Sequence, residues 1–413
     1  MTTRVRGQWV VLSLLVLSVT INYIDRGNLS IAASRLSTEL SIDPEKIGLL
    51  LSSFFWTYAA MQTVAGWLID RYSVYWIFAG GFFIWSAATA LTGLAGGFLT
   101  ILALRLLLGV GESVAYPAYS KIIAQGIPDQ HRGLANGLID AGCKAGPALG
   151  LMIGGVVLSH YGWRPLFVGI GLISMLWLIP WIGITLRAAR PSENKVVHSG
   201  LEIGPGLLEI AGQRSAWGTF LCLFCGNYVW YFLLTWLPWY LVRERHYSEA
   251  AMGRFGSLAF WAVGGASLIS GMISDRLVQH GGSPTFVRKA FAAGGLIGAI
   301  VIVFVPLLQS QSASLGVLIF ACISFGCYSS HPWLIAQTLA GPAAAGRWSG
   351  MQNTVGNLAG VIAPWLTGRI VRETGHFVYA FAVVGVILAL GAAGYLFAIG
   401  RIEPIVWRAK PVL

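Results

Sequence analysis

The sequence predicts an all-α membrane protein with twelve transmembrane helices in two six-helix halves. The composition is the first indication, because 56% of the 413 residues are hydrophobic and only 10% are charged, whereas a soluble domain carries about 25% charged residues. The mean hydropathy of +0.71 agrees with this. Long apolar runs recur along the whole chain, and one short motif occurs once in each half.

The apolar runs have the length of membrane-spanning helices, which need about 20 predominantly apolar residues. Strands of a membrane barrel would alternate apolar and polar residues over about 10 positions, and these runs are apolar throughout. The predicted spans are 8–30, 45–68, 75–96, 98–121, 133–158, 164–187, 215–241, 248–273, 287–308, 313–338, 347–370 and 376–400. The loops after the third and the ninth span are expected to be very short.

The distribution of basic residues predicts that both termini are cytoplasmic. Arg4 and Arg6 precede the first apolar run, and "VTINYIDRGN" lacks the small residues of a signal-peptide cleavage site. With this orientation, Lys and Arg are more frequent on the inner side than on the outer side, as the positive-inside rule requires. The net charge of +11 therefore indicates membrane topology rather than a nucleic-acid partner. We expect a multi-pass protein of the bacterial inner membrane.

One long polar stretch divides the predicted spans into six and six. It reads "LRAARPSENKVVHSGLEIGPGLLEIAGQR" and mixes Pro, Gly, acidic and basic residues, which is typical of a linker. Its part "SGLEIGPGLLEIA" has the composition of a short surface helix. The predicted organisation is an N-terminal half at 1–187, a cytoplasmic linker at 188–214 and a C-terminal half at 215–413.

A repeated motif links the two halves. "GWLIDRY" follows the second span and "GMISDRL" follows the eighth, so both copies read G-x-x-x-D-R. Duplicated six-span halves are the layout of the major facilitator superfamily, and this motif resembles its loop signature, although Ser73 replaces the expected Gly. Two interpretations remain: an ion pair that latches the inner side, or anchors that obey the positive-inside rule. The residues concerned are Asp70, Arg71, Asp275 and Arg276.

Six ionisable residues lie inside the apolar spans of the N-terminal half. Each ionised side chain at the bilayer centre costs about 2.5–3.5 kcal/mol on insertion scales, so six charges without a purpose are not expected. Three acids and three bases can neutralise one another across a shared interior. These residues are Asp25, Arg26, Arg105, Glu112, Asp140 and Lys144. The C-terminal half carries neutral polar groups instead, namely Asn227, His331, Gln337, Gln352, Asn353 and Asn357.

The spacing of these charges places them in pairs on helix faces. Arg105 and Glu112 are seven residues apart, so they share a face at a distance of about 10 Å. The glycines of "LRLLLGVGESVAYPAYS" would let another helix approach closely. Asp140 and Lys144 have the four-residue spacing of an intrahelical ion pair. That pair is either a buried static bridge or a group that faces the substrate path.

Two of these segments resemble a known family. "NYIDRGNLSIAA" resembles the first-helix signature of the anion:cation symporter family, the bacterial sugar-acid and organic-acid transporters related to sialin and the vesicular glutamate carriers. "LRLLLGVGESVAYPA" is similar to the fourth helix of that family. The similarity extends through "SSFFWTYAAMQTVAGWLIDR", "WYFLLTWLPWYL" and "GMQNTVGNLAG", so it covers essentially all spans.

The resemblance implies roles for four residues. In galactonate-type members, the first-helix acid and the fourth-helix Glu carry protons, which implies this role for Asp25 and Glu112. The Arg residues of the same helices hold the substrate carboxylate, which implies this role for Arg26 and Arg105. Burial favours the neutral form of a carboxyl group, whereas a nearby guanidinium favours the charged form. A ligand that takes the guanidinium therefore makes protonation easier, so anion and proton favour each other's binding.

Other polar residues are candidates for substrate contact. The fifth helix of galactonate-type members has a Gln near the substrate, and Cys143 stands there in this chain. Tyr23, Tyr58 and Gln62 have the groups to bind sugar hydroxyls, but aromatic residues in spans also serve as packing. Asn353 and Asn357 share a face of the eleventh span and favour ligand contact. We interpret His331, beside a proline, as structural.

The function that the sequence favours is a proton-coupled symporter that imports a small organic anion. The candidates for the anion are an aldonate or hexuronate, and alternatively an aromatic acid or a dicarboxylate. A drug exporter is the weaker alternative, because two arginines in the cavity disfavour a cationic substrate.

No HExxH, GxSxG or P-loop motif occurs, which argues against an enzyme or an ATP-driven pump. We expect no cofactor and no metal, because the CxxC of Cys222 and Cys225 lies in an apolar span and favours packing. Membrane lipid is an expected partner, and we expect a functional monomer.

Overall fold

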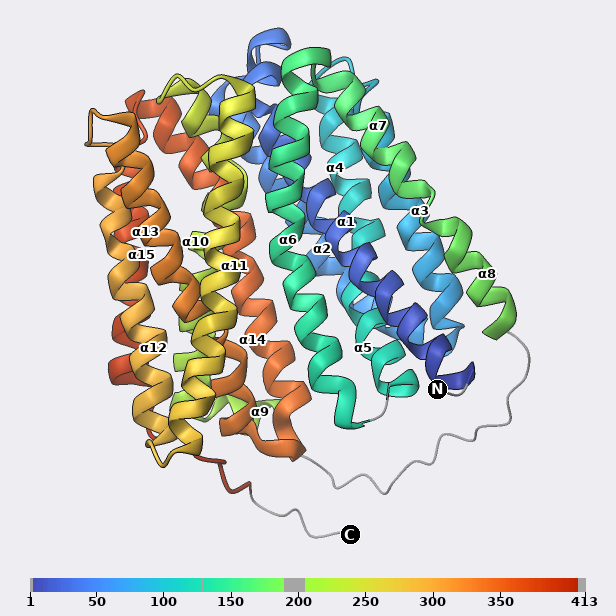
Figure 1. The fold of residues 1–413 in the computed structure, drawn as a ribbon, viewed down its shortest axis with the longest axis vertical. Coiled ribbons are helices and arrows are strands. Elements are labelled where there is room, and N and C mark those ends of the chain that lie inside the picture. The colour runs from blue at the N-terminus through green and yellow to red at the C-terminus, as the bar shows by residue number, and fades with distance from the viewer. Residues whose placement is uncertain (1–2, 128, 189–204, 408–413) are drawn as a thin grey trace. The chain divides into compact units, whose positions relative to one another are not determined.

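The computed structural model describes residues 3–127, 129–188 and 205–407, and these residues form helices joined by short turns (Figure 1). The helices before the linker are α1 (Thr3–Glu39), α2 (Pro44–Arg71), α3 (Val74–Thr92), α4 (Phe98–Glu112), α5 (Ala115–Gly126), α6 (Asp129–Tyr161), α7 (Trp163–Met175) and α8 (Leu178–Ala188). Those after it are α9 (Leu207–Ala211), α10 (Arg214–Arg243), α11 (Glu249–Gln279), α12 (Pro284–Ala299), the 3₁₀ turn η1 (Ile300–Phe304), α13 (Gln311–Ser329), α14 (His331–Thr374), α15 (Val378–Ala393) and the π-helical turn η2 (Gly394–Ala398). The predicted linker lies mostly outside the described residues, and its described part contains α9.

The predicted spans correspond to these helices, and several spans consist of two successive elements. The fourth is α4 followed by α5, the sixth is α7 followed by α8, and the ninth is α12 followed by η1. Helix α14 contains a break at Gly341, whose φ of 63° lies in the left-handed region that favours glycine. The break separates the end of the tenth span from the eleventh.

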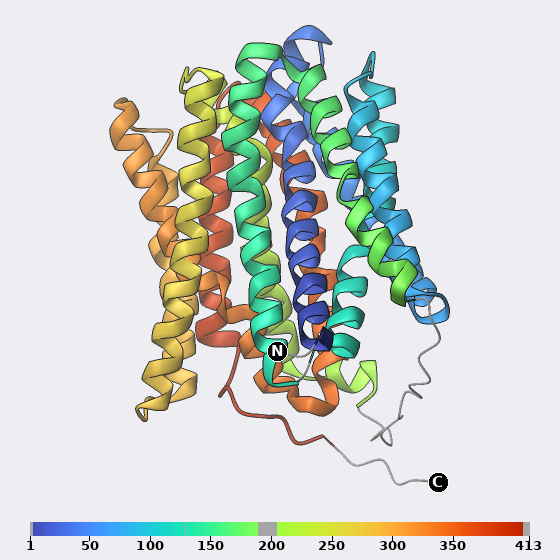
Figure 2. The same ribbon diagram turned by 45° about the vertical axis from the view of Figure 1, so that its right-hand side comes forward.

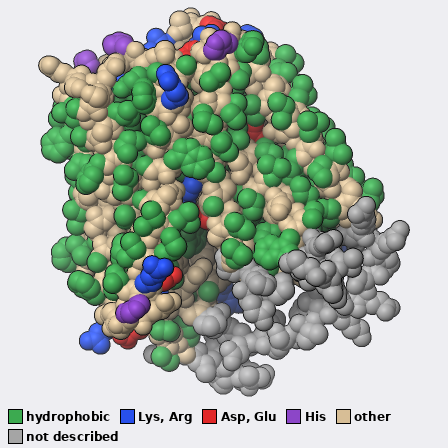
Figure 3. All heavy atoms as spheres, viewed as in Figure 1, with side chains coloured by type: hydrophobic (Ala, Val, Ile, Leu, Met, Phe, Trp, Pro, Cys, Tyr) green, Lys and Arg blue, Asp and Glu red, His purple; other side chains and the backbone are tan. Residues whose placement is uncertain are grey.

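The described residues have the all-α fold of a membrane protein, and its helices match the twelve predicted spans in position. Within the described residues, ten helical segments are long and apolar enough to cross a membrane. The other two predicted spans, 45–68 and 347–370, lie in α2 and in the part of α14 after Gly341. Apolar side chains are spread over the described part of the face seen in Figure 3, whereas charged and His side chains gather mainly toward its top and bottom. This distribution fits a surface in contact with lipid.

The chain divides into two compact units. The first consists of Met1–Ser192, Leu233–Trp261 and Pro364–His376, and the second of Glu193–Phe232, Ala262–Ala363 and Phe377–Leu413. The first unit thus contains all helices before the linker together with the ends of α10, α11 and α14. In the second unit, α12 packs against α13 and α15. The duplicated halves with boundaries at 187 and 215 stay a prediction.

Glycines set the close packing inside the first unit. Helix α1 packs along α6, and α3 packs along α7 (Figures 1 and 2). A Cβ atom on Gly142 would lie 2.6 Å from Val19, and one on Gly146 would lie 2.5 Å from Tyr23. These two glycines of α6 let α1 approach closely, as small residues do in membrane helices. Helix α1, which carries Asp25 and Arg26, is positioned in this way.

Two further glycine contacts join the helices of the N-terminal half to the ends of α11 and α14 in the same unit. A Cβ atom on Gly155 of α6 would lie 2.7 Å from both the Glu249 carbonyl oxygen and the Gly253 Cα of α11. A Cβ atom on Gly48 of α2 would lie 2.6 Å from the carbonyl oxygen of Pro364 in α14. The helix backbones therefore touch at both places.

Ion pairs reinforce these two contacts. Arg35 near the end of α1 holds Glu249 at the start of α11 with two hydrogen bonds, one of them Nη2 to Oε2 at 2.8 Å. Arg372 of α14 pairs with Glu45 in the first turn of α2. Asp43 caps α2 by accepting a hydrogen bond from the main-chain N–H of Lys46 at 2.9 Å. Partial burial acts to raise the pKa of Asp43, but the N–H and ammonium groups of Lys46 lower it below its ordinary value.

We expect Gly155→Ala to destabilise the protein, because its methyl group would overlap the backbone of α11. Overpacking of this kind costs about 1–3 kcal/mol. The measurement is thermal unfolding of the purified protein in detergent. Gly150→Ala on the same helix is the matched control, since its added Cβ would meet its nearest neighbour at 3.5 Å, an ordinary contact. Equal melting temperatures for both variants would contradict the close approach of α6 and α11.

Candidate substrate and proton site

Helices α1 and α4 bring an arginine and a glutamate into contact in the interior of the first unit. Arg26 Nε donates a hydrogen bond to Glu112 Oε2 at 2.6 Å, and the two side chains are 3% and 0% exposed. A buried ion pair recovers its desolvation cost only with good geometry and further hydrogen bonds. The sequence predicted opposite charges on these two helices, and the structure brings this pair together.

The local sequence explains why Glu112 ends α4. Pro117 has no N–H, so it cannot continue the helical hydrogen bonding back to Ser113, and the chain breaks before α5 begins. The glycines just before the break are equally important. A Cβ atom on Gly109 would lie 2.4 Å from a carbonyl oxygen of α2, and one on Gly111 would lie 2.7 Å from a main-chain nitrogen of α3. The expected close approach of neighbouring helices is thus confirmed, and it places Glu112 between them.

Aromatic rings surround the guanidinium of Arg26. Its Cζ lies 4.8 Å from the ring centroids of Tyr23 and Phe54 and 4.6 Å from that of Tyr58. Such cation–π contacts stabilise a desolvated cation. Gln62 is half-buried, one turn after Tyr58 on α2. Three of the predicted substrate contacts, Tyr23, Arg26 and Tyr58, therefore lie together.

Arg105 lies close to the same cluster. Its guanidinium carbon lies 5.3 Å from the ring centroid of Phe54, and its Nε donates to the carbonyl oxygen of Leu50 at 3.3 Å. The residue is 5% exposed. An arginine has five N–H donors, and the hydrogen bond to Leu50 is the one found within the described residues. Most of its donors therefore remain for a ligand, which fits the predicted role in holding a carboxylate.

Asp25 points away from its neighbour in sequence, as successive helix residues do. Its carboxylate is buried and accepts from Asn28 Nδ2 at 3.4 Å. The other oxygen, Oδ2, has no hydrogen bond within the described part of the chain. Trp85 and Thr89 of α3 lie within interaction range of this carboxylate. The cation beside Asp25 in the sequence therefore pairs with Glu112, while Asp25 faces α3.

A chain of weaker polar contacts leads from this cluster to α6. The hydroxyl oxygens of Tyr23 and Tyr116 lie 3.3 Å apart, and the Tyr116 oxygen lies 2.8 Å from the sulfur of Cys143. Cys143 is buried, at the position that the resemblance identified as departing from galactonate-type members. The Cys143 thiol is a weaker hydrogen-bonding group than the Gln amide expected at this position. The hydroxyl group of Tyr116 is therefore the stronger hydrogen-bonding group of the two residues in contact here.

The predicted pair on α6 forms. Lys144 Nζ donates to Asp140 Oδ1 at 3.0 Å. The two side chains differ in burial, with 17% of Lys144 and 57% of Asp140 exposed. Lys144 is thus the more buried partner, and Asp140 is exposed. The pair is therefore an ion pair with one exposed partner, which differs from the buried static bridge that the sequence allowed.

The residues of the repeated motif lie at helix ends in different units. Arg71 ends α2 and is exposed, whereas the side chain of Asp70 lies outside the described part of the chain. Lys121 of α5 donates to a main-chain carbonyl oxygen near this end of α2 at 2.6 Å. Asp275 and Arg276 are exposed in the last turns of α11, in the second unit. Their gating role stays a prediction.

The second unit contains the predicted amides of α14. Asn357 is buried and accepts a hydrogen bond from the hydroxyl group of Tyr231 at 3.0 Å, and Asn353 is half-buried on the same helix. Gln352 is fully buried, and neither of its amide atoms has a hydrogen bond within the described residues. His331 lies parallel to Phe291 at 5.4 Å between ring centroids, which fits the structural interpretation.

Sequence reasoning missed several residues of this site. Asn22 is fully buried, and both of its amide atoms are without a hydrogen bond among the described residues. Trp85 and Thr89 reach Asp25 from a helix that carries no charge in its span. Tyr116 was hidden among many aromatic residues. Of these residues, Asn22 is the one that the sequence could have indicated. A buried amide requires a hydrogen-bond partner, and Asn22 lies four residues before Arg26 in the same apolar span.

The described residues hold no group of three or more His, Cys, Asp or Glu side chains that could bind a metal ion. All five cysteines are free thiols. The polar chemistry of the first unit is therefore that of carboxylates, guanidinium groups and hydroxyls. Such a set can bind an anion and can take up or release protons.

Known transporters are similar to this chain over nearly its whole length. The probable galactarate/D-glucarate transporter of Bacillus subtilis is 29% identical, and the match covers 98% of this chain and 94% of the relative. The probable sulfoacetate transporter of Cupriavidus necator is 28% identical, with 96% and 95% covered. The probable chloroplastic anion transporter 4 of rice is 30% identical, with 93% and 67% covered.

A solved structure supports the same fold. The bacterial homolog of the human lysosomal transporter Spinster superposes with a TM-score of 0.82 at 20% identity, covering 95% of this chain and 97% of the other. The sequence pattern of the Major Facilitator Superfamily matches residues 15–364. These findings confirm the resemblance seen in the first and fourth helices and exclude the enzyme class. The chain belongs to the major facilitator superfamily, among its organic-anion transporters.

Proposed function

We propose that this transporter imports a small organic anion together with protons across a bacterial inner membrane, with both termini in the cytoplasm. The observation that carries the proposal is the buried contact between Arg26 and Glu112. It joins a permanent cation to a carboxylate that can take up a proton. A substrate carboxylate and Glu112 therefore compete for the same guanidinium.

This competition supplies the coupling. An arginine keeps its charge, while a glutamic acid can become neutral. When a proton neutralises Glu112, Arg26 becomes available for the carboxylate of the substrate. When the anion leaves, Arg26 attracts Glu112 again and favours release of the proton. The binding of anion and proton is then mutually favourable, as linkage requires.

Asp25 is a second proton carrier in this proposal. It is buried, it lacks a cationic partner in direct contact within the described residues, and it faces Trp85 and Thr89. Burial without a cation favours the neutral acid. The two acids thus differ in environment. The protonation of Glu112 depends on whether the substrate occupies Arg26, and the protonation of Asp25 depends on whether the site is open to water.

The proposed substrate carries two anionic groups. Galactarate, glucarate and sulfoacetate, which the names of the relatives print, are all dianions at neutral pH. The guanidinium groups of Arg26 and Arg105 both lie beside the ring of Phe54. A guanidinium binds a carboxylate with two parallel hydrogen bonds, and Arg26 would exchange Glu112 for one substrate carboxylate while Arg105 binds the other. Tyr23, Tyr58, Gln62, Asn353 and Asn357 are proposed to bind hydroxyl groups of the substrate. An aldonate, a hexuronate or an aromatic acid would use one guanidinium and leave the other to the protein.

Transport requires access to the site from each side in turn, as in other major facilitators. The pairs Arg35–Glu249 and Glu45–Arg372 are proposed as the outer latch, since the end of α1 lies outside when the N-terminus is cytoplasmic. Asp70, Arg71, Asp275 and Arg276 are proposed as the inner latch. Opening of the outer side then requires the glycine contacts of α6 with α11 to separate.

We expect Arg105→Ala to weaken anion binding by at least about tenfold, since one hydrogen bond to a charged group contributes about this much. Arg105→Lys should bind poorly too, because lysine lacks the planar fork. The measurement is ligand-induced thermal stabilisation of the purified protein by glucarate, with Arg214→Ala, an exposed arginine of α10, as control. If glucarate stabilised Arg105→Ala as much as the wild type, the proposed role of Arg105 would be wrong. Uptake of labelled cations, compared with uptake of labelled anions, tests the drug-exporter alternative.

The pair on α6 gives a second test. If Lys144 only neutralises Asp140, removal of both charges in Asp140→Asn/Lys144→Gln should impair transport less than Lys144→Gln alone, because an unpaired charge is the costly state. We expect the opposite, with equal loss in the single and double variants, because Lys144 is the more buried partner and its ammonium is proposed to attract a dianion. Uptake into proteoliposomes distinguishes the two outcomes. Recovery in the double variant would make the pair structural.

We expect Glu112→Gln to exchange internal for external anion but not to accumulate it, because the amide keeps the shape of the acid and cannot release a proton. Asp25→Asn should also fail to accumulate the anion. The measurement is uptake into proteoliposomes with an imposed pH gradient, compared with counterflow without a gradient. Glu373→Gln, an exposed carboxylate of α14, is the control. Gradient-driven accumulation at the wild-type level in both site variants would exclude both carboxylates as coupling groups.

A further inference from the structure

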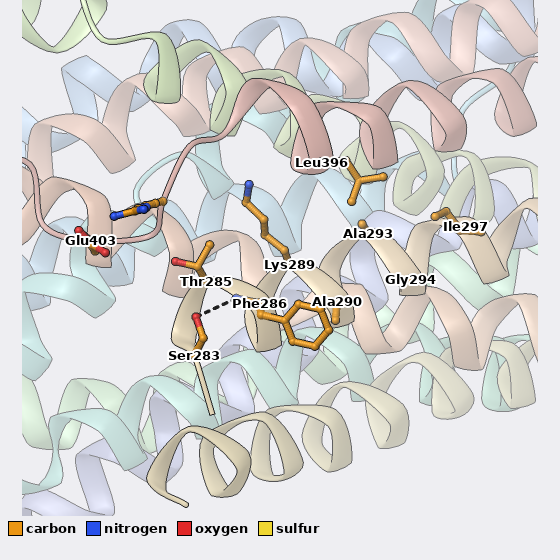
Figure 4. Close-up of a pocket in the computed structure, with 11 residues that line it drawn as sticks. Ser283, Thr285, Phe286, Lys289, Ala290, Ala293, Gly294, Ile297, Leu396 and Glu403 are labelled. Carbon is orange, nitrogen blue, oxygen red and sulfur yellow. Dashed lines mark hydrogen bonds between the residues drawn. The ribbon is translucent and has the colours of Figure 1, made fainter. Parts of the chain in front are cut away.

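The second unit has a pocket that the transport site does not use. It lies where the first turns of α12 meet the segment that follows η2, and its volume is about 720 Å³. Figure 4 shows Lys289 extending from α12 toward that segment, with Phe286, Ala293 and Leu396 along the wall. Two cations and one anion, Lys289, Arg401 and Glu403, belong to the lining.

The lining changes from polar to apolar along α12. Its first part carries Ser283, Thr285 and Lys289, and its later part consists of apolar residues up to Ile297. At 1.5 Å per residue, Ser283 and Ile297 lie about 21 Å apart along the helix. Phe286 is 74% exposed, and Ile297 and Leu396 are exposed as well. A ligand that fits this gradient has a polar head and a long apolar tail.

The charged residues of the pocket are held by an anchored segment. Ile402 is buried, and its main-chain N–H donates to Thr285 Oγ1 at 2.9 Å. Lys289 donates to the carbonyl oxygen of the residue after η2. Arg401 and Glu403 flank Ile402, and both are exposed. Arg401 and Glu403 both line the pocket, whereas Ile402 between them is buried against the protein.

We propose that this pocket binds a zwitterionic phospholipid of the surrounding bilayer, with the chemistry of phosphatidylethanolamine. Lys289 and Arg401 bind the phosphate, and Glu403 accepts hydrogen bonds from the ammonium group. Lysine has three N–H donors, so its bond to the main chain leaves donors for the phosphate. One acyl chain lies along Phe286, Ile297 and Leu396.

The acidic residue decides the type of headgroup. A phosphatidylglycerol headgroup has a phosphate but no cation, so Glu403 would repel it. A choline headgroup has a cation without N–H donors, so it cannot donate a hydrogen bond to Glu403. An ethanolamine headgroup satisfies both requirements, since charge-assisted hydrogen bonds form at its phosphate and at its ammonium group.

The test is native mass spectrometry of the purified full-length protein with dioleoyl lipids that differ only in the headgroup. Phosphatidylethanolamine should bind about tenfold more tightly than phosphatidylcholine, the amount expected for one hydrogen bond between charged groups. Its mono- and dimethylated derivatives should fall between the two. Glu403→Gln should remove this preference, while Arg401→Ala should weaken the binding of both lipids. Arg347→Ala, an exposed arginine of α14 in the same unit outside the pocket, should bind as the wild type does.

The proposal is overturned if the wild type binds the ethanolamine and choline lipids equally, or if phosphatidylglycerol binds more tightly than either. It is also overturned if Glu403→Gln keeps the preference, or if excess inorganic phosphate displaces the lipid. Should Arg401→Ala fail to fold, Arg401→Gln replaces it. The readout is lipid binding, so it does not depend on the identity of the transported anion.

Discussion

The buried contact between Arg26 and Glu112 is the constraint on which the organisation of the first unit depends. Two charges removed from water are tolerated only when their geometry is held firmly. The glycines of α4 and α6 allow backbones to approach α1, α2 and α3 closely, and the rings around Arg26 fill the space beside the guanidinium. Packing and electrostatics therefore act together, because the close helix contacts and the aromatic rings hold the buried charges in a small interior.

A site with unsatisfied polar atoms does not stabilise one conformation of the transporter strongly over another. A fully satisfied network would favour a single state, whereas a transporter needs two states of similar free energy. The described residues leave Asp25 Oδ2, Glu112 Oε1 and the amide of Asn22 buried without hydrogen bonds. Buried polar atoms without partners are costly. A ligand or a proton that satisfies them lowers the free energy of the state to which it binds, which is how occupancy can drive a conformational change.

The sequence predicted the fold well, because the bilayer restricts a spanning chain to continuous helices. It also identified the six charges within apolar runs, of which Asp25, Arg26, Arg105 and Glu112 are buried and Asp140 is exposed. It did not predict which charges meet. Arg26 is adjacent to Asp25 in sequence but contacts Glu112, because the direction of a side chain around a helix depends on how that helix packs. Arg35, Glu45, Glu249 and Arg372 escaped attention for a different reason, since charged residues at helix ends look like ordinary anchors at the membrane surface.

The ion pairs at the helix ends are accessible to water, whereas the ion pair in the interior is not. Arg35 is 37% exposed and Glu249 is 15% exposed, so water can replace their mutual contact at modest cost. Arg26 and Glu112 are buried from water, and in the proposed mechanism they separate when a proton or an anion takes the place of one partner. In that mechanism the contacts at the helix ends open by thermal fluctuation, whereas the interior pair opens when it binds a ligand. This ordering permits motion at the ends of the helices and makes productive motion depend on what the interior has bound.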